Sequence, residues 1–188
     1  MIGTHRKRNH EIDGVIGHAA HGSPATHIRT ATVSDLGAIV TCSNLAFALF
    51  AGKVDEDADN VQLAKNLSSQ ILEGSIRLIC DKTDVLGYIS FWPTSDTMFV
   101  DTLAVLPKHH RRGLGSELLA FADFETQRLG LRAITLFPKA RMTGNLRFYQ
   151  SRGYCETGRC DDDGFCRVFY TKKLPLLAAA AFSARRAV

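Results

Sequence analysis

The segment that most constrains the fold runs from Leu103 to Leu119 and reads LAVLPKHHRRGLGSELL. Its apolar start predicts a β-strand, and the apolar positions after Gly115 predict a helix. Between them lies a basic turn that contains Gly113 and Gly115, where backbone N–H groups can converge on an anion. The unpaired N–H donors and positive dipole end of the following helix add to them. The segment therefore predicts a strand, turn and helix that bind phosphate, with mobile charge from Arg111 and Arg112.

Two better-known phosphate motifs do not fit the chain. A P-loop requires G-x-x-x-x-G-K followed by Ser or Thr, and no such string occurs. The dinucleotide fingerprint requires a third glycine where Leu118 stands, and an acidic residue about 20 residues later at a strand end. These differences disfavour a nicotinamide-dependent enzyme. An ordinary basic loop with a glycine turn is the alternative, and the neighbouring segments must decide.

Three segments resemble motifs of the GCN5-related N-acetyltransferase (GNAT) family. Residues 110–115, HRRGLG, are similar to its signature of Gln or Arg, then x-x-G-x, then Gly or Ala, except that His110 holds the first position. Residues 144–154, GNLRFYQSRGY, resemble N-x-x-A-x-x-F-Y-x-x-x-G-F with compressed spacing, and residues 27–35, HIRTATVSD, resemble the opening strand and helix start. The three matches follow the order of the family, and the chain resembles the family from His27 to Leu174.

The resemblance implies a mixed, mostly antiparallel sheet flanked by helices, in which the fourth and fifth strands run parallel and splay apart. Unpaired backbone groups at such an opening can bind the amides of the pantetheine arm of coenzyme A. For the strand residues, a plain buried strand is the alternative, and the two are compatible. The cofactor-binding residues that the resemblance implies are Leu103, Ala104, Val105, His110, Arg111, Arg112, Gly113, Leu114, Gly115, Ser116 and Asn145.

The implied activity is transfer of an acetyl group from acetyl-CoA to a primary amine of a small molecule or peptide by direct attack. Tyr149 stands where the family commonly carries a tyrosine general acid, and a phenol with a pKa of about 10 is protonated at neutral pH. Alternatively, Phe148 and Tyr149 are core aromatics. Asn145, one helical turn earlier, is expected to contact the pantetheine or a water; the alternative is a helix-start residue that bonds nearby backbone.

The general base is less defined. Two-residue alternation predicts that Asp101 shares a strand face with Phe99 and Leu103, so that its carboxylate can take the amine proton directly or through water. Phe99 stands where some relatives carry a glutamate. The alternatives are that Asp101 pairs with a cation or caps a turn, and that water removes the proton without a dedicated base. By resemblance, the backbone N–H of Leu103 is the oxyanion donor.

The acceptor is not identified by the sequence. The acidic run at residues 55–59 either attracts a cationic amine or favours the positive end of the next helix. Phe47, Phe50 and Trp92 either line the acceptor cleft or belong to the core. A protonated His110 can pair with phosphate, so we expect coenzyme affinity to fall as the pH rises through about 6.5. A non-catalytic acyl-CoA sensor or scaffold is the alternative function.

Composition is consistent with one catalytic domain in a reducing compartment. The chain has 188 residues, 45% of them hydrophobic, a formal charge of +4 and five cysteines with no C-x-x-C pair. We therefore expect a cytoplasmic protein with no metal site, no nucleic-acid partner and no membrane association. Residues 1–26 are expected to be a flexible tail and residues 27–174 the acetyltransferase domain. Residues 175–188 are expected to be a tail or a short helix that packs against a second subunit in a homodimer.

Local patterns predict the order of helices and strands. Ser34 is expected to cap a first helix, and Gly74 to stop a second. Three antiparallel strands at residues 75–80, 86–92 and 98–106 follow, then a helix from Gly113 to near Gly130. A strand at 133–137, a helix from Thr143 to Gly153 and two final strands complete the prediction.

Overall fold

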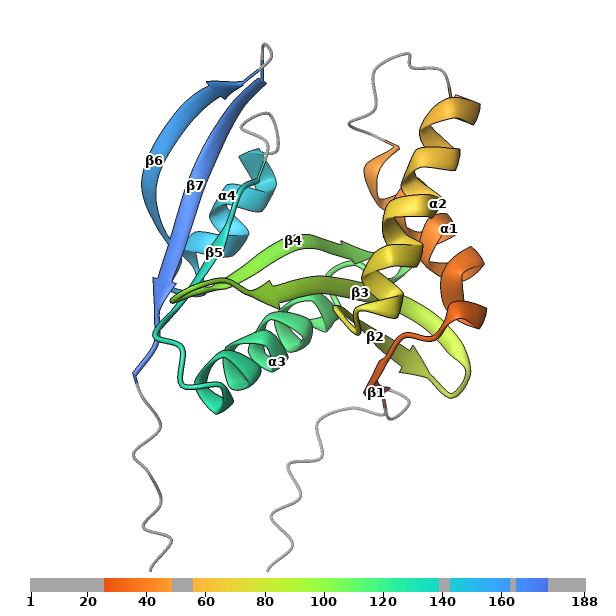
Figure 1. The fold of residues 1–188 in the computed structure, drawn as a ribbon, viewed down its shortest axis with the longest axis horizontal. Coiled ribbons are helices and arrows are strands. Elements are labelled where there is room, and N and C mark those ends of the chain that lie inside the picture. Colours follow the sequence, from red (N-terminus) through yellow and green to blue (C-terminus); the bar gives the residue numbers. More distant parts are fainter. Residues whose placement is uncertain (1–25, 49–55, 139–142, 163–164, 176–188) are drawn as a thin grey trace, which may run out of the picture.

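One sheet with helices on both faces makes up the computed structural model, which describes residues 26–48, 56–138, 143–162 and 165–175 (Figure 1). The strands are β1 (Thr26–Thr30), β2 (Ile76–Asp81), β3 (Asp84–Pro93), β4 (Met98–Val105), β5 (Ala133–Leu136), β6 (Cys155–Asp162) and β7 (Phe165–Lys173). The helices are α1 (Leu36–Phe47), α2 (Glu56–Leu72), α3 (Leu114–Arg128) and α4 (Thr143–Gln150), with 3₁₀ turns η1 (Val33–Asp35) and η2 (Pro107–His109).

The strand order is β1-β2-β3-β4-β5-β7-β6, and the sheet is mostly antiparallel. The predicted meander is confirmed, because β2, β3 and β4 pair antiparallel in sequence. The predicted parallel pair is also confirmed. Among the described residues, β4 and β5 pair over Met98–Val100 and Ile134–Leu136, after which β5 ends while β4 continues to Val105. The two strands therefore leave an opening beside the second half of β4, visible in Figure 1.

The predicted helix ends near Gly74 and Gly130 are confirmed, but the start of the first helix is not where we expected it. Thr32, not Ser34, caps the 3₁₀ turn η1 that leads into α1: its backbone N–H donates to the carboxylate of Asp35 at 2.8 Å, and Asp35 is the N-cap of α1. Ser34 lies inside η1. Arg29 of β1 also donates to Asp35, at 2.7 and 2.8 Å, so this carboxylate joins the first strand to the first helix. Within the described residues, no helix is both long and apolar enough to cross a membrane.

Two apolar cores lie on opposite faces of the sheet. One packs the sheet against α3 and α4 and includes Ile89, Met98, Leu118, Ile134 and Tyr149. The other packs it against α1 and α2 and includes Ile39, Leu67, Ile76, Leu78 and Tyr88. Each large side chain that is fully buried contributes about 1.5–3 kcal/mol. The sheet is thus held rigidly from both sides.

A β-bulge in β4 corrects the predicted alternation around Asp101. Thr102 pairs with Ser90 while Val100 pairs with Phe91, so Asp101 is the extra residue. Asp101 lies on the α2 face, where its carboxylate meets Gln70, and Phe99 points to the same face because its neighbours enter the other core. Leu103 packs against the α3 and α4 core instead. The prediction that all three share one face was therefore wrong for Leu103.

Candidate active site

The backbone of β4 is open on the side from which β5 has departed. The N–H of Leu106 donates to the carbonyl of Leu86 at 2.9 Å, so Leu106 and Ala104 turn their backbone groups toward β3. By strand alternation, Leu103 and Val105 turn theirs away from β3, into the opening. Of the three consecutive residues predicted to bind an amide-bearing arm, Leu103 therefore turns its backbone N–H and C=O into the opening, and Val105 turns its N–H there while its carbonyl is bonded by His110. Ala104 does not turn its backbone groups there.

The glycine turn after β4 holds a set of unpaired donors. Arg111 has φ +60° and Gly113 has φ +85°, and α3 begins at the next residue. The first helical bonds run from Ser116 and Glu117 to the carbonyl of Gly113. Among the described residues, no acceptor takes the backbone N–H groups of residues 111–115. These donors and the positive end of α3 suit a diphosphate.

The two glycines of the turn are needed for different reasons. Gly113 has open space around it, but its left-handed backbone disfavours a side chain. A Cβ on Gly115 would lie 3.3 Å from Cζ of Phe148 and 3.9 Å from Cγ2 of Val105. Gly115 thus allows α4 and β4 to pack closely against the start of α3.

Two histidines stabilise this turn. Nε2 of His110 lies 2.9 Å from the carbonyl oxygen of Val105, and because a carbonyl can only accept, Nε2 carries the proton. Nδ1 of His109 accepts a hydrogen bond from Arg112 at 2.8 Å. Burial, with the charges of Arg112 and Lys108, lowers the pKa of His109, which keeps this acceptor neutral. His110, expected to face a phosphate, instead uses one ring nitrogen to tie the turn to β4.

Arg152, which the sequence did not single out, joins the turn to α4. Its Nε donates to Oγ of Ser116 at 3.1 Å, its Nη2 contacts the same oxygen, and its Nη1 donates to the carbonyl of Phe148 at 2.9 Å. Its Cζ lies 3.7 Å from the centroid of the Phe148 ring, a cation–π contact. A positive charge is therefore held beside the first turn of α3.

Tyr149 lies on α4 inside the core that covers the α3 face of the sheet. The side chain is 8% exposed, and no described residue hydrogen-bonds its hydroxyl. Burial raises its pKa to about 12, so the phenol is protonated at neutral pH. Asn145 belongs to the same helix, but its side chain lies outside the described residues.

Asp101 lies across the sheet from Tyr149, on the α2 face. Its Oδ2 accepts from Nε2 of Gln70 at 3.3 Å and from Oγ1 of Thr102 at 3.0 Å. Gln70 is held in turn by the buried Ser90, which donates to its Oε1 at 2.7 Å. Oδ1 has no partner among the described residues, and the side chain is exposed. Gln70 was missed because no local pattern links a helix position to a residue 31 places later.

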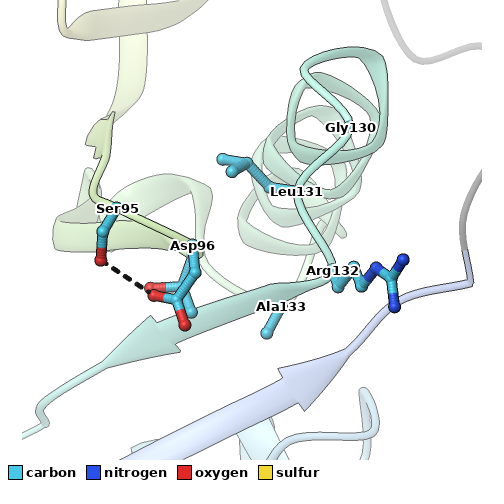
Figure 2. Close-up of a pocket in the computed structure, with 7 residues that line it drawn as sticks. Ser95, Asp96, Gly130, Leu131, Arg132 and Ala133 are labelled. Carbon is cyan, nitrogen blue, oxygen red and sulfur yellow. Dashed lines mark hydrogen bonds between the residues drawn. The ribbon is translucent and has the colours of Figure 1, made fainter.

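The other predicted acceptor residues are not all brought together. Phe47 packs against the α1 and α2 core, and Trp92 is half-buried with its ring 5.1 Å from that of Phe99. Phe50 and the side chains of residues 55–59 lie outside the described part of the chain. A separate hollow of about 340 Å³ lies where the turn before β4 faces the turn before β5 (Figure 2). It is lined by residues 95–97 and 130–133, so no predicted site residue borders it.

Comparison with known proteins agrees with this geometry. The acetyltransferase (GNAT) family model matches residues 49–154, more than half of the chain. No curated protein matches the sequence.

Several solved structures share the fold. The PaiA N-acetyltransferase from Thermoplasma acidophilum in complex with coenzyme A has a TM-score of 0.69 at 17% identity, over 80% of this chain and 99% of that one. The ribosomal-protein-S18-alanine N-acetyltransferase from Escherichia coli has a TM-score of 0.67 at 16% identity, over 84% of this chain and 99% of that one. The putative acetyltransferase YncA from Salmonella typhimurium, with acetyl-CoA, has a TM-score of 0.60 at 23% identity, over 82% of this chain and 97% of that one.

Because the solved structures are only 16–23% identical in sequence, their similarity establishes the fold alone. The match to the family model establishes the family. The predicted fold class is confirmed. The chain belongs to the GNAT family of acetyl-CoA-dependent N-acetyltransferases.

Proposed function

We propose that the protein transfers the acetyl group of acetyl-CoA to a primary amine of a small molecule or peptide by direct attack. The observation that carries the proposal is the continuity of two features: unpaired N–H groups at residues 111–115 and the open backbone of β4 that leads away from them. The first suits a diphosphate, and the second suits an extended chain with amide groups. Coenzyme A has both.

In this proposal the coenzyme is held by the residues around the turn. The backbone N–H groups of residues 111–115 bind the diphosphate beside Ser116, with charge from Arg111 and Arg112, and Leu103 and Val105 bind the pantetheine amides. Asn145 contacts the same arm from α4. His110 assists by holding the turn against the carbonyl of Val105.

The chemistry is divided between the two faces of the sheet. Asp101 takes a proton from the attacking amine through its unpartnered Oδ1, directly or through water. The N–H of Leu103 donates to the carbonyl oxygen as negative charge develops there. Tyr149, which is protonated at neutral pH, gives its hydroxyl proton to the departing sulfur. No covalent enzyme intermediate is needed, so the exposed Cys155 has no role.

Thiol release from acetyl-CoA, measured across a panel of amines, tests the proposal. Tyr149→Phe should lower kcat by about 10²- to 10⁴-fold, the usual contribution of a general acid. Coenzyme A binding, measured by calorimetry, should change by less than twofold, because the ring and its packing are kept. If the wild-type protein binds coenzyme A tightly but releases no thiol with any amine, it is an acyl-CoA sensor or scaffold instead.

A further inference from the structure

Four aromatic side chains form a continuous row across the sheet. They are Trp92 of β3, Phe99 of β4, Phe137 directly after β5, and Phe169 of β7. The ring centroids are 5.1 Å apart for Trp92 and Phe99, 5.0 Å for Phe99 and Phe137, and 4.4 Å for Phe137 and Phe169. We call these four residues the aromatic row; Figure 1 shows the strands that carry it.

The aromatic row lies on the face of the sheet opposite to α3 and α4. Phe91, Met98, Leu136 and Val168, which precede its members in sequence, all enter the core against those helices. Because side chains alternate along a strand, the row points the other way. The pairing of Trp92 with Phe99 sets the first two rings side by side.

The rings are partly open to solvent. Phe137 is 37% exposed, and the other three are half-buried. Aromatic surface left at the edge of a core marks a place where an apolar group can bind. The row also borders the opening, since Phe99 is in the last part of β4 that pairs with β5 and Phe137 follows the end of β5.

A negative charge lies beside Phe99, the second member of the row. Asp101 is two residues beyond Phe99 on the same face, where Gln70 and Thr102 both bond its Oδ2. Its Oδ1 has no partner among the described residues. The two bonds to Oδ2 fix the orientation of the carboxylate and leave Oδ1 available to a ligand. A carboxylate next to aromatic faces is complementary to a ligand that joins an ammonium group to an apolar ring.

The turn at residues 110–115 and Tyr149 are on the other side of the sheet. A molecule on the aromatic row therefore does not compete with the coenzyme for space, and the two can meet only through the opening between β4 and β5. That arrangement is what a direct transfer between two bound substrates requires.

We infer that the acceptor is an arylalkylamine, whose ring lies on the aromatic row and whose ammonium group is bound by Asp101. This inference rests on the proposed function and names its substrate class. In the reaction, Asp101 takes one proton from the ammonium group, and the neutral nitrogen forms the new bond to the acetyl carbon. The bond from that carbon to sulfur breaks, and the sulfur leaves as a thiol with the proton of Tyr149, which the second nitrogen proton replaces.

Trp92 allows a test that does not depend on turnover, because it is the single tryptophan of the chain. Phenethylamine is titrated into the full-length protein saturated with coenzyme A, and the fluorescence of Trp92 is followed. We expect a saturable change with an apparent Kd at least tenfold lower than for ethanolamine, which lacks the ring, or for phenethyl alcohol, which lacks the ammonium group. Equal affinity for the three would overturn the inference.

Variants divide the two contributions. Phe137→Ser should raise the Kd for phenethylamine at least fivefold, whereas Phe124→Ser, at a 54% exposed position of α3 outside the row, should leave it unchanged. Asp101→Asn should raise the Kd for phenethylamine and leave the Kd for phenethyl alcohol unchanged. If Phe137→Ser unfolds, judged by circular dichroism, Phe137→Leu takes its place. If a folded Phe137 variant binds phenethylamine with an unchanged Kd, the ring of the ligand does not lie on the aromatic row.

The same experiments separate this inference from the proposed function. If coenzyme A binds and polar amines are acetylated with a kcat/KM at least equal to that of phenethylamine, the substrate class is wrong and the proposed function stands. If phenethylamine binds as expected but no thiol is released, the proposed function fails, and the aromatic row with Asp101 remains a binding site for arylalkylamines. If coenzyme A does not bind, both fail.

Discussion

At the scale of single residues, the conformation of Gly113 decides whether the turn before α3 can form. Gly113 has φ +85° with open space where a Cβ would stand, so its substitution acts through backbone strain alone. Gly37 is a matched position in α1, with open space and no left-handed backbone. Within a helix, glycine is less stabilising than alanine.

Gly113→Ala and Gly37→Ala are therefore expected to have opposite effects on the free energy of unfolding. Gly113→Ala should lower it by about 1–2 kcal/mol through left-handed strain and should weaken coenzyme A binding. Gly37→Ala should raise it by about 0.5 kcal/mol and leave binding unchanged. Urea unfolding and calorimetry measure both. A Gly113→Ala protein as stable as the wild type would show that the turn can adopt another conformation.

At the scale of elements, Arg152 couples the start of α3 to the end of α4. It bonds Ser116 at the start of α3 and the carbonyl of Phe148 near the end of α4, while its guanidinium covers the Phe148 ring. Phe148 in turn packs beside Gly115. The Arg152 side chain therefore links the position of the turn to that of the helix carrying Tyr149.

Arg152→Gln should raise the KM for acetyl-CoA by about tenfold, corresponding to about 1.4 kcal/mol, with a smaller change in kcat. Because the loss concerns the turn, S-acetylpantetheine, which has no diphosphate, should be affected much less. Arg147→Gln provides the control, since Arg147 is an exposed arginine of the same helix. Equal losses with the two donors would mean that Arg152 acts through general stability rather than through the turn.

At the scale of the whole molecule, the pH dependence of stability is set in part where β1 meets α1. The Arg29 guanidinium holds the pKa of Asp35 well below its usual range, and the N–H and hydroxyl of Thr32 add to the effect. A carboxyl group with a lowered pKa in the folded state stabilises the fold above its unfolded pKa of about 3.9. That stability is lost as the pH falls below this value.

Asp35→Asn should consequently destabilise the protein by about 1–2 kcal/mol at pH 7. The difference from the wild type should shrink as the pH is lowered from about 4 toward 2, because the carboxyl group of the unfolded wild-type chain takes up a proton and so offsets the stability of the ion pair. Thermal unfolding of both proteins at several pH values measures this. A difference that stays constant down to pH 2 would contradict the assigned role of the ion pair.

The sequence by itself determined the order of the elements, the fold class and the position of the glycine turn between β4 and α3. These depend on local signals: apolar periodicity, the glycines that end α2 and α3, and a motif confined to residues 110–115. The tertiary structure decided the rest of the candidate site. The bulge at Asp101 follows from the pairing of β4 with β3, and the contacts of Gln70, Arg152 and the aromatic row join residues far apart in the chain. No local pattern encodes such contacts, because they arise only when separate strands and helices pack together.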